Sequence, residues 1–282
     1  MIEHGPDGEV VAGALTVPDE PPASAPASTR TAAFFDVDNT VLRGASIFHL
    51  AKGLWKRGFF TGRDIAAMLW KQVHFALVGE NLAHMAKIRE QALTFVAGHT
   101  VDEIERIGEE VYDEVMADKI WPGTRALAQS HLESGHDVWL VTASPVEVAT
   151  VIASRLGLTG ALGTVAENLD GVYTGRLVGE PLHGASKAVA VEALADQRGY
   201  ELELCSAYSD SANDLPMLEL VGDPCAINPD AKLRAKAREM GWRVRDYRTG
   251  RKAARAGVFA AAVAGAVAGT VAAGAAIRRR VG

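Results

Sequence analysis

Two carboxylates that directly follow a short apolar run are the residues of this chain best suited to chemistry. Residues 36–40, DVDNT, come after the run 32–35, which predicts a buried strand with an acid at its carboxyl end. Because side chains alternate along an extended chain, Asp36 and Asp38 face the same side. Crowded carboxylates repel each other unless a cation binds or one is protonated, and both states suit phosphoryl transfer. The alternative interpretation is a solvated loop with two acids.

A second acidic cluster follows another apolar run, residues 204–208. Asp210 and Asp214 are four residues apart, with Asn213 between them, and they share one face if the segment enters a helix. Carboxylate oxygens in a loop are ligands that suit Mg²⁺. The alternative is that Asp210 or Asn213 caps a helix, which is compatible with a metal role.

Two single polar residues lie between these clusters at the ends of predicted elements. Thr142 ends the apolar run 138–141, and its hydroxyl with the following amides could hold a phosphate oxygen. Lys187 opens a predicted helix after residues 184–186, where its ammonium group could neutralise phosphate charge. The alternatives are a capping threonine and a solvated lysine.

The order of helix and strand signals predicts an α/β fold. From residue 121 onward they alternate, which is typical of a doubly wound parallel sheet with helices on both faces. A turn at Asp170-Gly171 predicts a small hairpin between residues 164–169 and 172–177. We therefore expect a catalytic core formed by residues 31–44 and 121–248.

Residues 45–120 have helical patterns and few strand signals, which predicts a helical cap inserted after the first strand. We expect helices near 46–57, 64–78, 81–95 and 101–119, the last of them capped by Thr100 with Glu103. An insertion there emerges at the carboxyl ends of the strands, the edge at which ligands bind in open α/β sheets. A mobile cap over the site is expected.

Composition and charge limit the classes of binding partner and indicate the cellular compartment. The net charge of −6, without a dominant basic stripe, gives no support for a nucleic-acid partner. Cys205 and Cys225 are expected to be reduced thiols in or near the core. Residues 1–30 predict a disordered N-terminal tail and lack the pattern of a signal peptide. These features favour a cytoplasmic catalytic domain.

The C-terminal residues 251–282 form a hydrophobic tail with basic flanks. The run 256–277 has 22 residues without charge, which predicts a transmembrane helix that anchors the catalytic domain to the cell membrane. Gly265 and Gly269 would let two such helices pack closely, as in a helix-mediated dimer. The alternatives are an alanine-rich surface helix and a disordered tail.

The motifs and their order resemble the haloacid dehalogenase-like hydrolase superfamily, and within it the branch around phosphoserine phosphatase. The resemblance covers roughly residues 31–245 and includes the helical insertion after the first motif. Four motifs of that family have counterparts here, in this order: Asp36, Asp38 and Thr40; Thr142; Lys187; and Asp210 with Asn213 and Asp214.

The resemblance implies roles for the acidic residues. Asp36 would attack phosphorus and become phosphorylated, and Asp38 would protonate the leaving oxygen and then activate water. Asp36, the backbone carbonyl of Asp38, and Asp210 would hold Mg²⁺, with Asp214 as a supporting acid. Thus the resemblance implies an aspartyl-phosphate intermediate and a Mg²⁺ cofactor.

The resemblance also implies phosphate-binding roles for Thr142, Lys187 and Asn213. Lys187 and the metal would offset the repulsion between a dianionic substrate and several carboxylates.

The chain departs from the phosphoserine phosphatases at the residue that meets the substrate amine. They carry a Glu a few residues past the first motif, whereas the position nine residues after Asp36 is Ala45 here. Arg89 is a candidate for the cap arginine that pairs with the substrate carboxylate, and Arg43 is a second candidate for anion contact. Alternatively, Arg89 lies on a solvated helix face.

These observations predict a phosphatase that hydrolyses a small phosphomonoester, with a substrate that the sequence leaves open. One alternative is a phosphotransferase of the same fold, in which an alcohol replaces water as the acceptor. Another, from a different class, is a membrane-tethered regulatory protein with an idle site.

Overall fold

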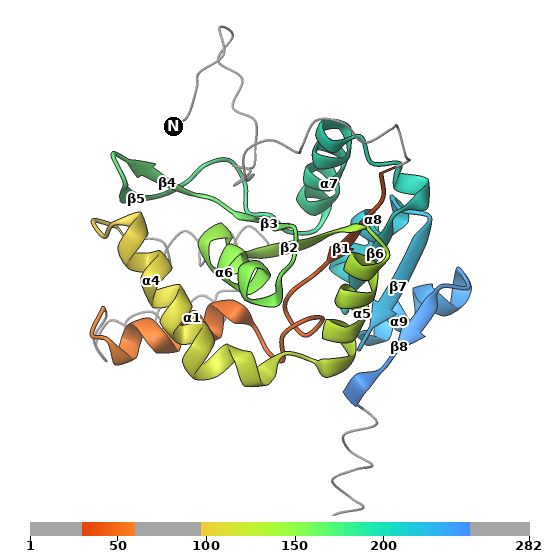
Figure 1. Ribbon diagram of the computed structural model, residues 1–282, viewed down its shortest axis with the longest axis horizontal. Coiled ribbons are helices and arrows are strands. Elements are labelled where there is room, and N and C mark those ends of the chain that lie inside the picture. The colour runs from red at the N-terminus through yellow and green to blue at the C-terminus, as the bar shows by residue number, and fades with distance from the viewer. Residues whose placement is uncertain (1–29, 60–96, 249–282) are drawn as a thin grey trace, which may run out of the picture. The chain divides into compact units, whose positions relative to one another are not determined.

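The computed structural model describes residues 30–59 and 97–248 (Figure 1). Contacts divide the chain into two units, residues 1–244 and 245–282, and the candidate site lies in the first. Several predicted segments lie outside the described residues: nearly all of the N-terminal tail, the helices at 64–78 and 81–95, and the run 256–277 with its two glycines.

Six strands form the main sheet in the order β3-β2-β1-β6-β7-β8. Strand β1 pairs in parallel with β2 and β6, β2 pairs in parallel with β3, and β6 with β7. The strands are β1 (Ala32–Phe35), β2 (Asp137–Pro145), β3 (Gly160–Thr164), β6 (Ser206–Ser209), β7 (Asp223–Ile227) and β8 (Arg243–Arg245). The expectation of an α/β fold with a parallel sheet is confirmed.

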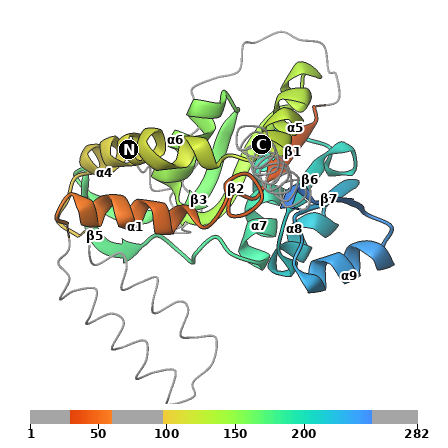
Figure 2. The same cartoon turned by 90° about the horizontal axis from the view of Figure 1, so that it is seen from below.

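The helices of the core follow the strands in alternation, and Figure 2 shows the sheet with helices on either side. They are α5 (Pro122–Glu133), α6 (Val146–Leu156), α7 (Ala185–Arg198), α8 (Leu215–Glu219) and α9 (Ala231–Glu239). Short 3₁₀ turns at Leu202–Leu204 and Ala212–Asp214 precede β6 and α8. Helix α8 begins with a proline in its first turn, where the missing amide hydrogen costs nothing.

Alternation along β1 divides its two phenylalanines between the faces of the sheet. Phe34 belongs to a buried cluster with Trp139 and with apolar side chains of α7, α8 and α9. Phe35 stacks on Tyr208 at 4.2 Å between ring centroids and meets His131 of α5 edge-on. A strand covered on both faces is almost wholly apolar, which explains why the run before Asp36 contains no polar residue.

The strand order brings the carboxyl ends of β1 and β6 together. From β1 the chain continues to β2 and β3 on one side, then crosses to β6 and β7 on the other. Ligands of doubly wound sheets bind where the strand order reverses, beyond the carboxyl ends of the strands. Asp36 follows β1 and Asp210 follows β6, so both acids lie at this point.

Helices α1 (Ser46–Lys56) and α4 (Val101–Val111) belong to the long connection between β1 and β2. The predicted cap of α4 is confirmed, because the Thr100 side chain accepts a hydrogen bond from the Glu103 amide at 3.2 Å. The Glu103 carboxylate turns to His99 instead of completing the capping box. Helical structure continues to Lys119 as expected, through a π-helical turn at Tyr112–Met116 and a 3₁₀ turn at Ala117–Lys119.

The predicted hairpin is also confirmed. Strands β4 (Ala166–Leu169) and β5 (Val172–Leu177) pair antiparallel around Asp170 and Gly171, both of which have positive φ. A turn of this kind favours those two residue types. The short strand β3 before the hairpin was not predicted separately.

Both cysteines are buried free thiols, as expected, and the Cys205 sulfur accepts a hydrogen bond from the Ala32 amide at 3.3 Å. Within residues 30–59 and 97–248, no helix is long and apolar enough to cross a membrane.

Replacing Gly53 by Ala tests the close approach of α1 to α4. A Cβ at Gly53 would overlap a methyl carbon of Val111, so the Val111 side chain or one of the helices must shift. We expect the free energy of unfolding to fall by about 1–3 kcal/mol, as for other overpacked positions. Gly108→Ala is the matched control, because a Cβ there meets its nearest neighbour at 3.8 Å. Equal unfolding free energies for the two variants in urea denaturation would contradict this packing.

Candidate active site

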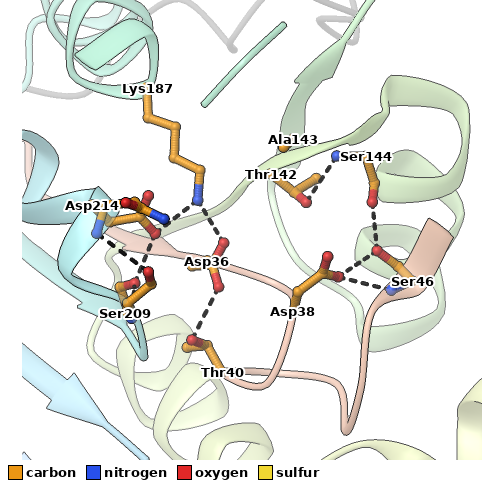
Figure 3. A network of polar contacts seen from close by, with 12 residues as sticks. Asp36, Asp38, Thr40, Ser46, Thr142, Ala143, Ser144, Lys187, Ser209 and Asp214 are labelled. Carbon is orange, nitrogen blue, oxygen red and sulfur yellow. Dashed lines mark hydrogen bonds and ion pairs between the residues drawn. The ribbon is translucent and has the colours of Figure 1, made fainter. Parts of the chain in front are cut away.

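Asp36 lies at the centre of a network of polar side chains beyond the carboxyl end of β1 (Figure 3). One of its carboxylate oxygens accepts a hydrogen bond from the Lys187 ammonium at 2.5 Å, and the other accepts one from the Thr40 hydroxyl at 3.1 Å. Its amide donates to the carbonyl of Tyr208, which ties it to β6. These contacts hold the carboxylate in one orientation.

Lys187 joins Asp36 to Asp214. The Lys187 side chain comes from the first turn of α7, and its ammonium group lies 2.8 Å from an Asp214 oxygen that also accepts from the Ser209 hydroxyl. The side chains of Lys187, Asp36 and Asp214 are 3%, 8% and 3% exposed. Buried charges persist only when they are paired and hydrogen-bonded, and this triad satisfies that condition.

Burial and the neighbouring charges both shift the pKa values of this network. Burial is the largest effect on Asp36 and raises its pKa to about 8; Lys187 opposes that rise, whereas Asp214 and Asp38 add to it. Burial, followed by the charge of Asp214, likewise raises the pKa of Asp210 to about 7. Burial alone would lower the pKa of Lys187, but Asp36 and Asp214 outweigh it and raise that pKa above its ordinary value.

Asp38 faces a separate set of partners on the other side of Asp36 (Figure 3). Its Oδ1 accepts hydrogen bonds from the amide of Ser46 at 2.8 Å and from the hydroxyl of Ser46 at 2.5 Å. The Ser46 hydroxyl lies 2.6 Å from that of Ser144 in β2. Because their partners differ, the two acids of the first motif occupy different electrostatic surroundings.

A tight turn after β1 brings both acids to the same edge. The amides of Val41 and Leu42 donate to the carbonyl of Val37, and Asn39 has a φ of 62°. Asn is one of the few residues with a side chain that tolerate this conformation. The turn is further held by Asn228, whose side-chain amide donates to the Asn39 carbonyl.

The predicted phosphate-binding residues differ in their placement. Thr142 is buried near the carboxyl end of β2, and its oxygen accepts a hydrogen bond from the Ser144 amide at 3.2 Å. Lys187 lies in the network already described. Asn213 is exposed, and the structure shows no hydrogen bond from its side chain to the described residues of this network.

The structure gives contacts for one of the two arginine candidates, Arg43. The Arg43 guanidinium donates to the carbonyls of Lys119 and Asp118 and lies over the ring of Trp121. It thus connects the segment after β1 to the segment before α5. Arg89 lies outside the described residues.

The donor set is consistent with a divalent cation. Within the described ranges, no three His, Cys, Asp or Glu side chains gather as a metal-binding group. The expected ligands need no such group, since they are the side chains of Asp36 and Asp210 and the backbone carbonyl of Asp38. Asp36 and Asp214 share the one Lys187 cation, and Asp38 and Asp210 add two further carboxylates, so acids outnumber cations at this edge of the sheet. Oxygen ligands with excess negative charge suit Mg²⁺.

Sequence reasoning missed the hydroxyl groups that hold the acids. Ser46, Ser144 and Ser209 were given no role, although each is buried and donates to or pairs with a neighbour of the site. The only signals in the sequence were that Ser46 begins the predicted helix near 46–57 and that Ser144 lies three residues after the apolar run 138–141. These signals do not reveal a contact between residues 98 positions apart.

Comparison with known proteins agrees with this geometry. Residues 33–219 match the model of the haloacid dehalogenase-like hydrolase family. The chain belongs to this family. As a haloacid dehalogenase-like hydrolase it is 57% identical over 234 residues to phosphoserine phosphatase SerB1 of Mycobacterium tuberculosis, covering 83% of this chain and 76% of the relative. The expected hydrolase family and its phosphoserine phosphatase-like branch are confirmed.

Two further comparisons extend the likeness. The histidinol-phosphatase of Neisseria meningitidis serogroup C is 29% identical over 220 residues, which are 77% of this chain and 98% of the relative. A crystal structure of a protein with unknown function from Bordetella pertussis Tohama I has a TM-score of 0.69 and 32% identity, covering 78% of this chain and 99% of its own. The names of these two curated relatives agree with the expected enzyme class, a hydrolase of phosphoric monoesters.

Replacing Lys187 by Met tests whether this residue holds the buried acids together. Asp36 and Asp214 would lose their shared cation, and breaking a buried pair from one side typically costs about 3–5 kcal/mol. We expect a fall of that size in the free energy of unfolding, measured by urea denaturation with a chelator present. Lys52→Met, at an exposed position of α1, is the control and should change stability by no more than about 0.5 kcal/mol. Comparable stability of both variants would be inconsistent with the role of Lys187.

Proposed function

We propose that this chain is a Mg²⁺-dependent phosphatase that hydrolyses a small phosphomonoester through a phosphorylated Asp36. The pair of acids after β1 supports this function most directly. Asp36 is fixed beside the cation of Lys187, and Asp38 is held apart by Ser46. These different surroundings support a role for Asp36 in the attack and for Asp38 in proton transfer.

In the first proposed step, an Asp36 oxygen attacks phosphorus as the bond from phosphorus to the leaving oxygen breaks. Asp38 gives its proton to that oxygen, so the product leaves as a neutral alcohol. In the second step, Asp38 takes a proton from water, and the resulting hydroxide attacks phosphorus. The bond to Asp36 breaks, inorganic phosphate is released, and both acids return to their starting states.

Lys187, Thr142 and Asn213 are proposed to bind the phosphoryl oxygens. The Lys187 ammonium already lies against Asp36, at the atom where phosphorus would arrive. The Thr142 hydroxyl is buried nearby and accepts from the Ser144 amide, which leaves its proton available to a phosphoryl oxygen. Fixed donors at the place where charge develops stabilise the transition state.

Asp36, Asp210 and the Asp38 carbonyl are proposed to hold Mg²⁺. The bound ion would supply positive charge that offsets the repulsion between a dianionic phosphate and the buried carboxylates.

The proposed substrate class is a small phosphorylated alcohol. Two relatives are named for phosphoserine and histidinol phosphate, both of which carry an amine. Ala45 stands where the resemblance expects the acid that meets an amine, so this chain must recognise an amine through other residues or accept a different alcohol. Phosphate release from a panel of phosphorylated metabolites, including these two and lipid phosphates, identifies the substrate.

Attachment to a membrane through residues 256–277 remains a proposal that rests on the uncharged run and its basic flanks. The full chain should sediment with membranes, and a chain ending at residue 248 should not. Equal distribution of the two chains would contradict the proposal.

Replacing Asp36 by Asn removes the attacking oxygen while preserving side-chain size. We expect the rate of phosphate release to fall by at least about 10³-fold, because removal of a catalytic nucleophile typically causes losses of this size or larger. Circular dichroism should show an unchanged fold. Asp118→Asn, at an exposed position, is the matched control and should keep full activity. An Asp36→Asn variant that turns over normally would refute the assignment of the nucleophile.

Removing divalent cations tests the proposed cofactor. A chelator should abolish phosphate release, and added Mg²⁺ should restore it. Isothermal titration calorimetry should detect Mg²⁺ binding to the wild type and at least about tenfold weaker binding to Asp210→Asn, since carboxylates are principal ligands. Full activity in excess chelator, or identical Mg²⁺ binding by both proteins, would exclude this site.

A further inference from the structure

Two buried hydroxyl groups beside Asp38 are not used by the proposed reaction. Ser46 and Ser144 are 0% and 3% exposed, and their oxygens lie 2.6 Å apart. One begins helix α1 and the other lies in β2, so the pair joins two segments at the site. Burying a hydroxyl costs free energy unless the group is hydrogen-bonded. The hydrogen bonds of these two serines therefore decide what the pair can do.

The hydrogen bonds of the pair have a definite direction. The Ser46 hydroxyl lies 2.5 Å from Asp38 Oδ1, and the Ser46 amide donates to the same oxygen at 2.8 Å. When Asp38 is ionised, the Ser46 hydroxyl must donate to it and therefore accepts from Ser144. The chain of donors thus runs from Ser144 through Ser46 to Asp38 Oδ1, and such chains strengthen each member.

This direction assigns different tasks to the two oxygens of Asp38. Oδ1 faces two donors, one of which is an amide that cannot accept a proton in return. Within the described residues, Oδ2 accepts no hydrogen bond from the protein. A proton carried by Asp38 is therefore favoured on Oδ2, the oxygen left to meet the substrate.

The backbone of α1 contributes to the same arrangement. Ser46 is the first residue of α1, and the residue before it, Ala45, provides no side-chain cap. The first turn of α1 contains no acid of its own, so the Asp38 carboxylate satisfies a free amide at the positive end of the helix. Helix and acid thereby fix each other.

We infer that Ser46, supported by Ser144, is a positioning residue that orients Asp38 so that Oδ2 delivers its proton to the leaving oxygen. The inference rests on the proposed phosphatase function and deepens it. As the bond from phosphorus to the leaving oxygen breaks, the proton on Oδ2 passes to that oxygen, and Oδ1 remains bound to Ser46. Phosphorus is then bonded to Asp36, and Asp38 is ionised.

The test compares substrates that differ in their need for a proton. Benzyl phosphate releases an alcohol that must be protonated, whereas 4-nitrophenyl phosphate releases a stable anion. The ratio kcat/KM reports the steps up to release of this group. Ser46→Ala keeps the amide donor and removes the hydroxyl. We expect kcat/KM for benzyl phosphate to fall about 10–100-fold, a part of the roughly 10²–10⁴ that general acid catalysis provides.

For 4-nitrophenyl phosphate, the same variant should lose less than about threefold, because its leaving group needs little protonation. Ser144→Ala should also lose more kcat/KM with benzyl phosphate than with 4-nitrophenyl phosphate. The difference should be smaller than in Ser46→Ala, because only the more distant donor is removed. Ser46→Thr restores a hydroxyl and should recover benzyl phosphate hydrolysis in part. Ser154→Ala, an exposed serine on α6, is the matched control and should change neither substrate.

Equal losses with both substrates in Ser46→Ala would overturn the inference, because a general disturbance of the site does not discriminate between leaving groups. If Ser46→Ala fails to fold, Ser144→Ala decides in the same way. A wild-type enzyme that hydrolyses neither substrate nor any phosphorylated metabolite would instead refute the proposed function. The two failures are therefore distinguishable.

Discussion

The ion pair between Lys187 and Asp36 is the interaction on which the rest of the site depends. Four carboxylates gather beyond the ends of β1 and β6, and Lys187 is the one buried lysine or arginine among the described residues. It lies between two of the acids and lets both remain in a site almost without solvent. Since the acids still outnumber it, the arrangement is left with a demand for further positive charge.

The parallel sheet makes this concentration of charge possible. Neighbouring parallel strands end at the same edge of the sheet. Acids that follow different strands therefore lie close together although they are far apart in the sequence. A network of short hydrogen bonds then gives two of these acids, Asp36 and Asp38, different partners. Asp36 is fixed by Lys187 and Thr40, while Asp38 turns to the first residue of α1.

The sequence predicted the parts of this site that follow from local pattern. A parallel sheet, the acids after two apolar runs, and the hairpin at Asp170 could all be inferred from residue type and spacing. The serine contacts could not, because the meeting of Ser46 and Ser144 depends on where α1 begins relative to β2. Likewise, Lys187 was expected to meet phosphate, and only the folded chain shows its contacts with Asp36 and Asp214.

We propose that phosphate is transferred to Asp36 during turnover. Acid quenching of the enzyme with its best substrate, followed by borohydride reduction and peptide mass spectrometry, measures this directly. We expect conversion of Asp36 alone to homoserine, and only when substrate is present. Homoserine at another aspartate, or phosphate retained on a serine or histidine during turnover, would contradict it.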